Sequence, residues 1–143
     1  MENTGPNKEY SFELKRVSLL EKNLNLQNHA GKQDEFEFDI SLQIRNNRES
    51  KECLHLMRVG INSKKTEKLV GSIQLLCAFS IPNFEEYVSD SEKGSSLPED
   101  LLYLLNSVII GTMRGVMFSE FRGTVLNNAY LPVLDPRKFE QAD

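Results

Sequence analysis

The residues with the clearest capacity for chemistry in this 143-residue chain are its two cysteines and two histidines. Cys53 and His55 stand two positions apart in an alternating apolar run, Cys77 lies in another such run, and His29 lies in a polar stretch. Side chains two apart on a strand share a face, so Cys53 and His55 should lie side by side. Two ligands do not make a zinc site, and no C-x-x-C pair is present. We interpret both cysteines as buried, reduced thiols and expect no metal.

Motifs for nucleophilic catalysis and for phosphate binding are also missing from the sequence. No Gly-x-Ser-x-Gly elbow occurs. The stretch Gly111-Thr-Met-Arg-Gly115 lacks the Lys-Ser/Thr of a phosphate loop and falls inside an expected helix. Glu35, Glu37 and Asp39 alternate with apolar residues, as on the solvated face of a sheet; the other interpretation is an acidic docking surface. We predict that the chain is not an enzyme and needs no cofactor.

The overall composition restricts the class of partner. Apolar residues make up 39% and charged residues 27%, in a chain long enough to bury one core. The net charge of −4 and the pI of about 5.3 argue against nucleic acid or an anionic membrane, which would favour a basic surface. No apolar signal region opens the chain, and no unbroken apolar run approaches the ~20 residues of a membrane span. We expect a cytoplasmic chain with no nucleic-acid partner and no membrane insertion.

Strand periodicity dominates the first half of the chain. The cleanest example is 36–44, where five apolar residues alternate with polar ones. In the first segment the apolar phase shifts after Leu14, as a β-bulge would cause, and Gly71 in the last one marks a second bulge or a close backbone approach. Strands in succession without intervening helices imply an antiparallel sheet. The predicted strands cover residues 10–26, 36–44, 52–62 and 68–81.

Helix signals follow a polar loop over 89–96. Ser96-Leu-Pro-Glu99 fits a capping box, apolar residues then recur at helical spacing, and Gly123 is a suitable stop. These signals predict a helix over 97–121. Asp135-Pro136 reads as the cap and first residue of a short helix through Phe139. The predicted fold is α+β: a four-stranded antiparallel sheet, then a long helix and a short C-terminal helix packed on one face. Residues 1–9 should be disordered and 10–143 should form a single domain.

The long helix is apolar around most of its circumference. A helix of that kind is buried on more than one side, whereas one sheet covers only one side. Gly111 and Gly115, one turn apart, would let another helix approach closely. We therefore predict a subunit interface; the alternative is a helix sunk in its own monomer. The predicted interface residues are Leu105, Ile109, Gly111, Arg114 and Gly115.

A set of short likenesses, in the same order along the chain, connects residues 10–140 to a known family. They are Phe12-Glu-Leu-Lys-Arg16-Val, Phe79-Ser80-Ile81, Leu104-Leu-Asn106, Arg114-Gly115, Arg122-Gly123-Thr124, Asn127 and Leu131-Pro132-Val133. Together with the order of elements they resemble the SecB family of export chaperones.

The resemblance implies an assembly and a function. SecB-like subunits pair through their first strands and long helices, and two such dimers pack into a tetramer. The family binds unfolded preproteins in apolar grooves without ATP and passes them to the SecA motor, while some relatives protect an unstable antitoxin. We therefore expect a homo-oligomeric holdase, a dimer of dimers, with unfolded polypeptides as clients for export or one dedicated client such as an antitoxin. Candidate client-binding residues are Leu24, Leu26, Phe36, Tyr130, Leu131 and Phe139.

The sequence departs from the family at several positions. The loop from Asn28 to Glu35 is short and polar, where the family carries apolar and aromatic groups. Glu21 matches one acidic SecA-docking position, but Asn25 and Ser72 fall where acids are expected, and the docking tail is not found. We expect docking to a SecA-type motor to be weak or absent.

Two further classes of protein stay open at this stage. A hotdog-type thioesterase also wraps an antiparallel sheet around a long helix, but it would need a carboxylate or histidine at the helix–sheet junction. The helix interior offers only Asn106 and Arg114, and the helix follows all the strands. The other class is an interaction subunit without chaperone activity, which suppression of aggregation would separate from a holdase.

Overall fold

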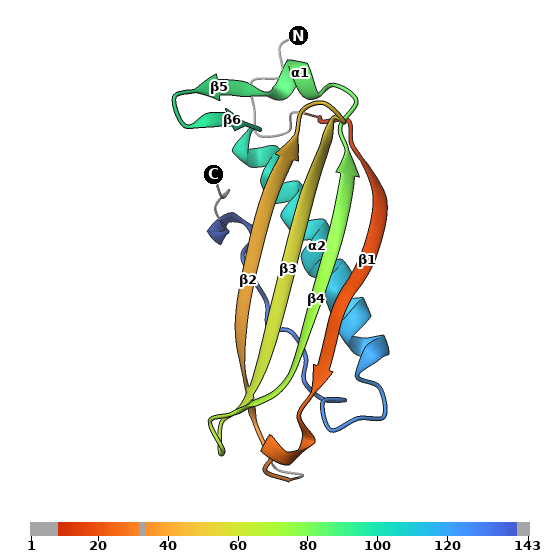
Figure 1. The fold of residues 1–143 in the computed structure, drawn as a ribbon, viewed down its shortest axis with the longest axis vertical. Coiled ribbons are helices and arrows are strands. Elements are labelled where there is room, and N and C mark those ends of the chain that lie inside the picture. The colour runs from red at the N-terminus through yellow and green to blue at the C-terminus, as the bar shows by residue number, and fades with distance from the viewer. Residues whose placement is uncertain (1–8, 32–33, 140–143) are drawn as a thin grey trace.

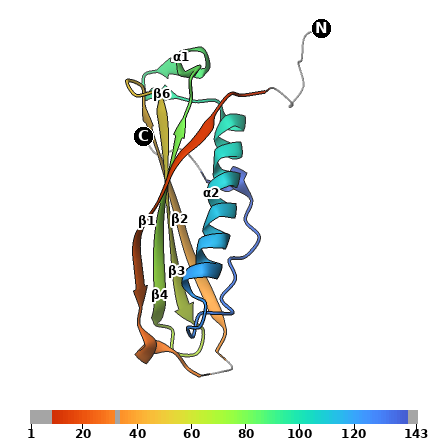
Figure 2. The same cartoon turned by 90° about the vertical axis from the view of Figure 1, so that its right-hand side faces the viewer.

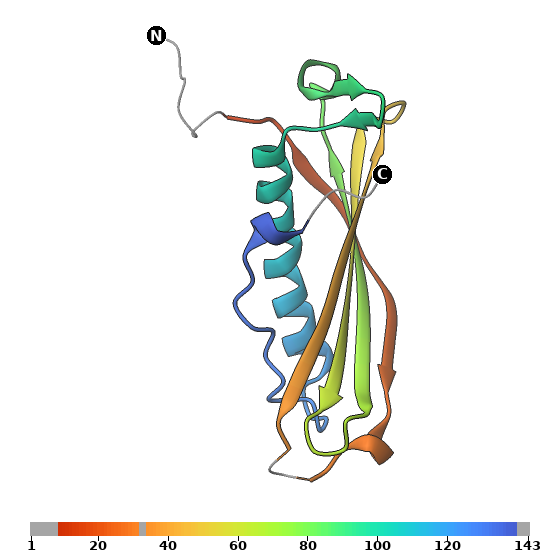
Figure 3. The same ribbon diagram turned by 90° about the vertical axis from the view of Figure 1, so that its left-hand side faces the viewer.

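The computed structural model describes residues 9–31 and 34–139. Its central feature is a four-stranded antiparallel sheet of long strands, crossed by one long helix (Figure 1). Side views show the helix and the chain that follows it on the same face of the sheet (Figures 2 and 3). The strands are β1 (Glu13–Leu24), β2 (Phe36–Asn47), β3 (Glu52–Ser63) and β4 (Leu69–Ser80), in the spatial order β1-β4-β3-β2.

The four predicted strands are confirmed, and β1 and β2 form the two edges of the sheet. The register of β1 on β4 shifts between Leu14 and Arg16 and again between Leu19 and Glu21. The predicted bulge is therefore present, and a second irregularity follows it along the strand. Gly71 allows the predicted close approach, because a Cβ there would collide with Leu126. A one-turn helix, η1 (Leu26–Asn28), follows β1.

The core lies between the inner faces of β3 and β4 and the helix α2 (Glu99–Glu120). Alternation on β3 and β4 places the large apolar side chains on that face, as the sequence pattern indicated. The fully buried members from the sheet and the helix include Met57, Val59, Ile61, Ile73, Leu75, Phe79, Leu101, Leu105 and Ile109.

The predicted capping box at the start of α2 is wrong. The helix begins at Glu99 with Pro98 as its cap residue, and no side chain caps it. Ser96 is not available because it is the last residue of a strand, β6 (Gly94–Ser96). The helix ends one residue before the predicted limit, and Gly123 follows it with a φ of 78°, which favours glycine. By length and composition α2 could span a membrane, but here its apolar face packs on the sheet.

The segment 89–96, predicted as a polar loop, forms a small hairpin instead. The strand β5 (Ser89–Ser91) pairs with β6, after a one-turn helix α1 (Phe84–Tyr87). Arg48, in the turn between β2 and β3, joins these parts. Its guanidinium donates two 2.9 Å hydrogen bonds to Glu85 and one of 2.8 Å to Asp90. This pairing fixes the hairpin at the end of the sheet.

The chain after α2 turns at 121–128 and then runs extended beside the helix to η2 (Pro136–Lys138) (Figure 3). The predicted cap at Asp135 is confirmed, since its Oδ1 accepts from the Arg137 backbone N–H at 3.0 Å. The short C-terminal helix is a single 3-10 turn. We call residues 129–139 the C-terminal segment.

Candidate functional site

The C-terminal segment lies along one side of α2 and is held there by two helix side chains. Arg114 donates from Nη2 to the Pro132 carbonyl at 2.8 Å, and Asn106 donates from Nδ2 to the Pro136 carbonyl at 2.9 Å. The two anchors stand eight residues apart on the helix, which is about 12 Å along its axis. Each end of the segment borders a cavity, so the segment connects two candidate binding regions.

The first cavity lies beside the last turns of α2 and has a volume of about 220 Å³. We call it the helix-end cavity. Phe118 and Tyr130 stand at it and are each 64% exposed, which is unusual for aromatic side chains and marks a surface suited to an apolar ligand. The Arg114 guanidinium supplies the charged group of the lining. The lining consists of Arg114, Met117, Phe118, Asn127, Ala129, Tyr130 and Leu131.

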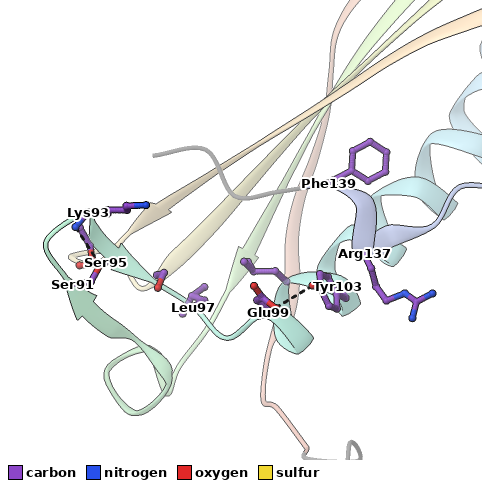
Figure 4. A pocket seen from close by; sticks show the side chains of 11 residues that line it. Ser91, Lys93, Ser95, Leu97, Glu99, Tyr103, Arg137 and Phe139 are labelled. Atoms are coloured by element: carbon purple, nitrogen blue, oxygen red, sulfur yellow. Dashed lines mark hydrogen bonds between the residues drawn. The ribbon is translucent and has the colours of Figure 1, made fainter.

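The second cavity, of about 380 Å³, lies between the β5–β6 hairpin, the first turns of α2 and the end of the C-terminal segment. We call it the hairpin cavity. Figure 4 shows hairpin residues on one side and Arg137 and Phe139 on the other, with Tyr103 and Glu99 between them. The Tyr103 hydroxyl donates to Glu99 Oε2 at 3.3 Å. The apolar part of the lining is Leu97, Leu102, Tyr103 and Phe139.

The structure divides the six predicted client-binding residues among three places. Tyr130 and Leu131 line the helix-end cavity, although Leu131 is only 6% exposed. Phe139 lines the hairpin cavity. The remaining three lie near η1, where Leu24 and Phe36 pack against the core and Leu26 is 56% exposed. The six residues therefore do not form one continuous patch.

The predicted interface residues separate into two groups. Leu105 and Ile109 are fully buried in the core of this chain, which leaves them no exposed surface for a contact with another subunit. Their apolar character is explained by the sheet. Gly111, Arg114 and Gly115 are exposed, and a Cβ at either glycine would meet nothing within 4 Å. The open face of the helix also carries Leu104 and Phe118.

Acidic side chains occupy the outer face of the sheet. Glu37 and Asp39 are exposed on β2, as the alternation predicted, and Glu21 is exposed on β1. The Glu21 carboxylate accepts a hydrogen bond from Asn23. Ser72 is 3% exposed and lies within reach of the Asn23 amide, at 3.4 Å. The exposed acidic side chains of the outer face are therefore spread over the two edge strands.

A polar cluster is buried at the junction of helix and sheet. Cys53 Sγ lies 3.3 Å from His55 Nε2, and the Asn106 carboxamide interacts with the same imidazole from the helix. Burial raises the pKa of the Cys53 thiol to about 12 and lowers the pKa of His55 to about 4. Both groups are therefore neutral at pH 7, so no thiolate–imidazolium nucleophile forms.

The cluster also bears on the thioesterase alternative. His55 is the histidine at a helix–sheet junction that such an enzyme would need, but it is fully buried and neither cavity includes it. Within residues 9–31 and 34–139, no group of three or more His, Cys, Asp or Glu side chains could hold a metal ion.

Sequence reasoning missed two features of this region. The sequence pattern predicts a loop over 89–96 and so misses the hairpin cavity. The available signal was Gly94, a residue typical of tight turns, which begins β6 with a φ of 108°. The contact from Asn106 to Pro136 spans 30 positions in sequence and had no local signal.

Comparisons with known proteins bear on the fold. No protein-family model matches the chain, and no curated protein matches its sequence. The structure is similar to that of Rv1957 of Mycobacterium tuberculosis, a SecB-like chaperone solved in complex with a ChAD peptide from the Rv1956 HigA1 antitoxin. The TM-score is 0.54 at 8% identity, over 87% of this chain and 84% of that one. The predicted SecB-like α+β fold is therefore confirmed.

Proposed function

We propose that this chain is an ATP-independent holdase that binds unfolded or newly made polypeptides, on the premise of its SecB-like fold. The observation that carries the proposal is the pair of exposed aromatic side chains, Phe118 and Tyr130, at the helix-end cavity. An unfolded chain exposes apolar side chains that such a surface can bury. The favourable free energy would be roughly 25 cal/mol per Å² of apolar surface, before the cost of ordering the client.

The β2 edge supports binding of an extended client. The Lys64 backbone N–H donates to the Glu35 carbonyl at 2.8 Å, which sets the hydrogen-bonded pairs between β2 and β3 at odd-numbered residues of β2. The backbone groups of the even-numbered residues therefore point toward the free edge. Those residues carry the inward apolar side chains, including Phe38, Ile40 and Leu42. An added strand could pair with this edge and extend the apolar face.

The β1 edge supports self-association. Leu14, Val17, Leu19 and Leu20 are between 39% and 53% exposed on that strand, and an exposed apolar edge strand is an unfavourable feature of a monomer. The open face of α2, with Gly111 and Gly115, offers a second surface. Pairing through β1 and packing through α2 would give the dimer of dimers.

A dedicated client is the narrower form of the proposal. The similar Mycobacterium tuberculosis chaperone is solved with an antitoxin peptide, which supports a polypeptide client of that kind here. Docking to a SecA-type motor would rely on Glu21 and on scattered acids of the outer face. Exposed ion pairs contribute only about 0–1 kcal/mol each, so we expect this docking to be weak. Pull-down of bound chains from cells would separate an antitoxin from a mixture of export clients.

The proposal is tested by titrating a fluorescently labelled, permanently unfolded polypeptide with the oligomer, with and without ATP. We expect nucleotide-independent binding that weakens at least several-fold in Phe118→Ser and Tyr130→Ser. Val133→Ser is the matched control, because Val133 is 96% exposed on the same segment and lines neither cavity. No binding by the correctly assembled wild type would contradict the proposal.

A further inference from the structure

The buried polar cluster connects three elements in a single chain of contacts. Cys53 and His55 belong to β3, Asn106 to α2 and Pro136 to the C-terminal segment. His55 and Asn106 have no exposed surface, and the Phe79 ring packs edge-on against His55 with centroids 5.2 Å apart. Polar side chains are costly in an apolar core unless their hydrogen bonds are satisfied. Each donor and acceptor of this cluster is therefore expected to have a hydrogen-bond partner.

The hydrogen-bonding partners fix the orientation of the Asn106 amide. The Pro136 carbonyl can only accept, so the group 2.9 Å from it must be the Asn106 NH₂. The Asn106 Oδ1 is then the atom left for the His55 imidazole, with which the Asn106 carboxamide interacts. Among the described residues, Asn106 Oδ1 and His55 Nδ1 are both buried and have no other hydrogen-bond partner, so each is the group that remains for the other.

One tautomer of His55 accounts for both atoms. A proton on Nδ1 would give Asn106 Oδ1 a donor and would leave Nε2, 3.3 Å from Cys53 Sγ, to accept from the thiol. The high pKa of the thiol keeps that proton in place at neutral pH. The opposite tautomer would put a lone pair against Asn106 Oδ1 and an N–H against the weak acceptor Cys53 Sγ.

We propose that Asn106 is a positioning residue for the client-binding surface: it fixes the C-terminal segment to α2, and the His55–Cys53 pair on β3 fixes its amide. The segment is the shared wall of both cavities, with Tyr130 and Leu131 at one and Arg137 and Phe139 at the other. Asn106 holds its C-terminal half, as Arg114 holds its N-terminal half. The effect on clients rests on the proposed function; the effect on the segment does not.

Two substitutions separate this role from packing. Asn106→Leu keeps most of the side-chain volume but cannot donate to Pro136. Ser107→Ala is the matched control, because Ser107 is the next residue of the helix, is exposed, and donates its hydroxyl to the Tyr103 carbonyl within the same helix. Hydrogen exchange is followed at the Arg137 and Lys138 amides, which bond to Asp135 within the segment.

We expect the Arg137 and Lys138 amides of Asn106→Leu to exchange roughly two- to tenfold faster, the factor associated with one neutral hydrogen bond, while β3 amides and Ser107→Ala stay at wild-type rates. Affinity for an unfolded client should fall by a similar factor. Unchanged exchange, or unchanged client affinity in a wild type that does bind, would overturn the proposal. A wild type that binds no client would count against the proposed function alone.

A second measurement keeps the test decisive if Asn106→Leu does not fold. In the wild-type protein, long-range ¹H–¹⁵N spectra of the His55 ring report which nitrogen carries the proton. The proposal requires a protonated Nδ1 and an unprotonated Nε2 at pH 7. A protonated Nε2 would contradict it, because Asn106 would then have no donor from His55 to fix its amide.

Discussion

Gly71 of β4 and Leu126, in the turn after α2, lie so close that a Cβ at Gly71 would come within 3.0 Å of the Leu126 side chain. The Asn23 carbonyl oxygen of β1 would lie 3.1 Å from the same Cβ. Leu126 is 1% exposed and has little room to move. We expect Gly71→Ala to lower the free energy of unfolding by about 1–3 kcal/mol, as measured by urea titration.

The control for this prediction is Gly60→Ala, on the neighbouring strand β3. The nearest atom to a Cβ at Gly60 would be Leu69 Cδ1 at 3.5 Å, an ordinary van der Waals contact, so the free energy of unfolding should stay within about 1 kcal/mol of the wild type. If Gly71→Ala has the same free energy of unfolding as the wild type, the predicted clash between its Cβ and Leu126 is contradicted.

Gly115 provides a test of assembly. Its position on the open face of α2 leaves space for a side chain within one chain, so Gly115→Leu should not destabilise a monomer. If helices of two subunits pack there, the same change crowds the interface, at a cost of about 1–3 kcal/mol. Analytical ultracentrifugation across a concentration series should therefore show weaker association in Gly115→Leu. Identical sedimentation of the two proteins would place the interface elsewhere, and a stable wild-type monomer would refute the oligomer.

Stability should fall as the pH is lowered from about 6.5 to about 4. The pKa of His55 is near its usual 6.5 in the unfolded chain and about 4 in the folded one, so the unfolded state binds more protons in this window. Acidification therefore lowers the free energy of unfolding progressively, by on the order of 3 kcal/mol for the shift from 6.5 to about 4. The measurement is the difference between wild type and His55→Gln in urea-unfolding free energy at pH 7, 6 and 5. Parallel pH dependences would rule out His55 as the cause.

Arg48 should protect the β5–β6 hairpin from proteolysis. Its guanidinium is the link from the β2–β3 turn to Glu85 and Asp90, and Lys93 at the hairpin tip is a trypsin site. We expect Arg48→Gln to be cleaved after Lys93 faster than wild type. Arg45→Gln, on the exposed face of β2, serves as the control and should be cleaved at the wild-type rate.

How much of this molecule the sequence predicts depends on the range of the interaction. The alternation of 36–44 gave β2 correctly, because a half-buried strand carries its burial pattern in every second residue. The cap at Asp135 could also be predicted, because its side chain bonds to a backbone N–H only two residues away. The capping box predicted at Ser96 was wrong although its spacing to Glu99 fits the motif. Ser96 instead pairs within the β5–β6 hairpin and does not cap α2. Leu105 and Ile109 were assigned to a subunit interface because periodicity measures how apolar a helix is but cannot identify what covers it.

The candidate site depends on contacts that no local pattern encodes. Arg114 reaches Pro132 and Asn106 reaches Pro136 only because the chain reverses after Gly123 and returns along α2. The sequence could suggest that Tyr130 and Phe139 are functional. It could not show that they stand at separate cavities, which are joined by a segment fixed to the helix.

The central claim is that this chain holds unfolded polypeptides without nucleotide, and aggregation of a chemically unfolded client tests it most directly. Light scattering is followed after dilution of the client into buffer with increasing amounts of the oligomer and no ATP. We predict suppression that becomes complete near stoichiometric oligomer and that is weakened in Phe118→Ser but not in Val133→Ser. Undiminished aggregation at several-fold molar excess, with the oligomer intact, would contradict the account.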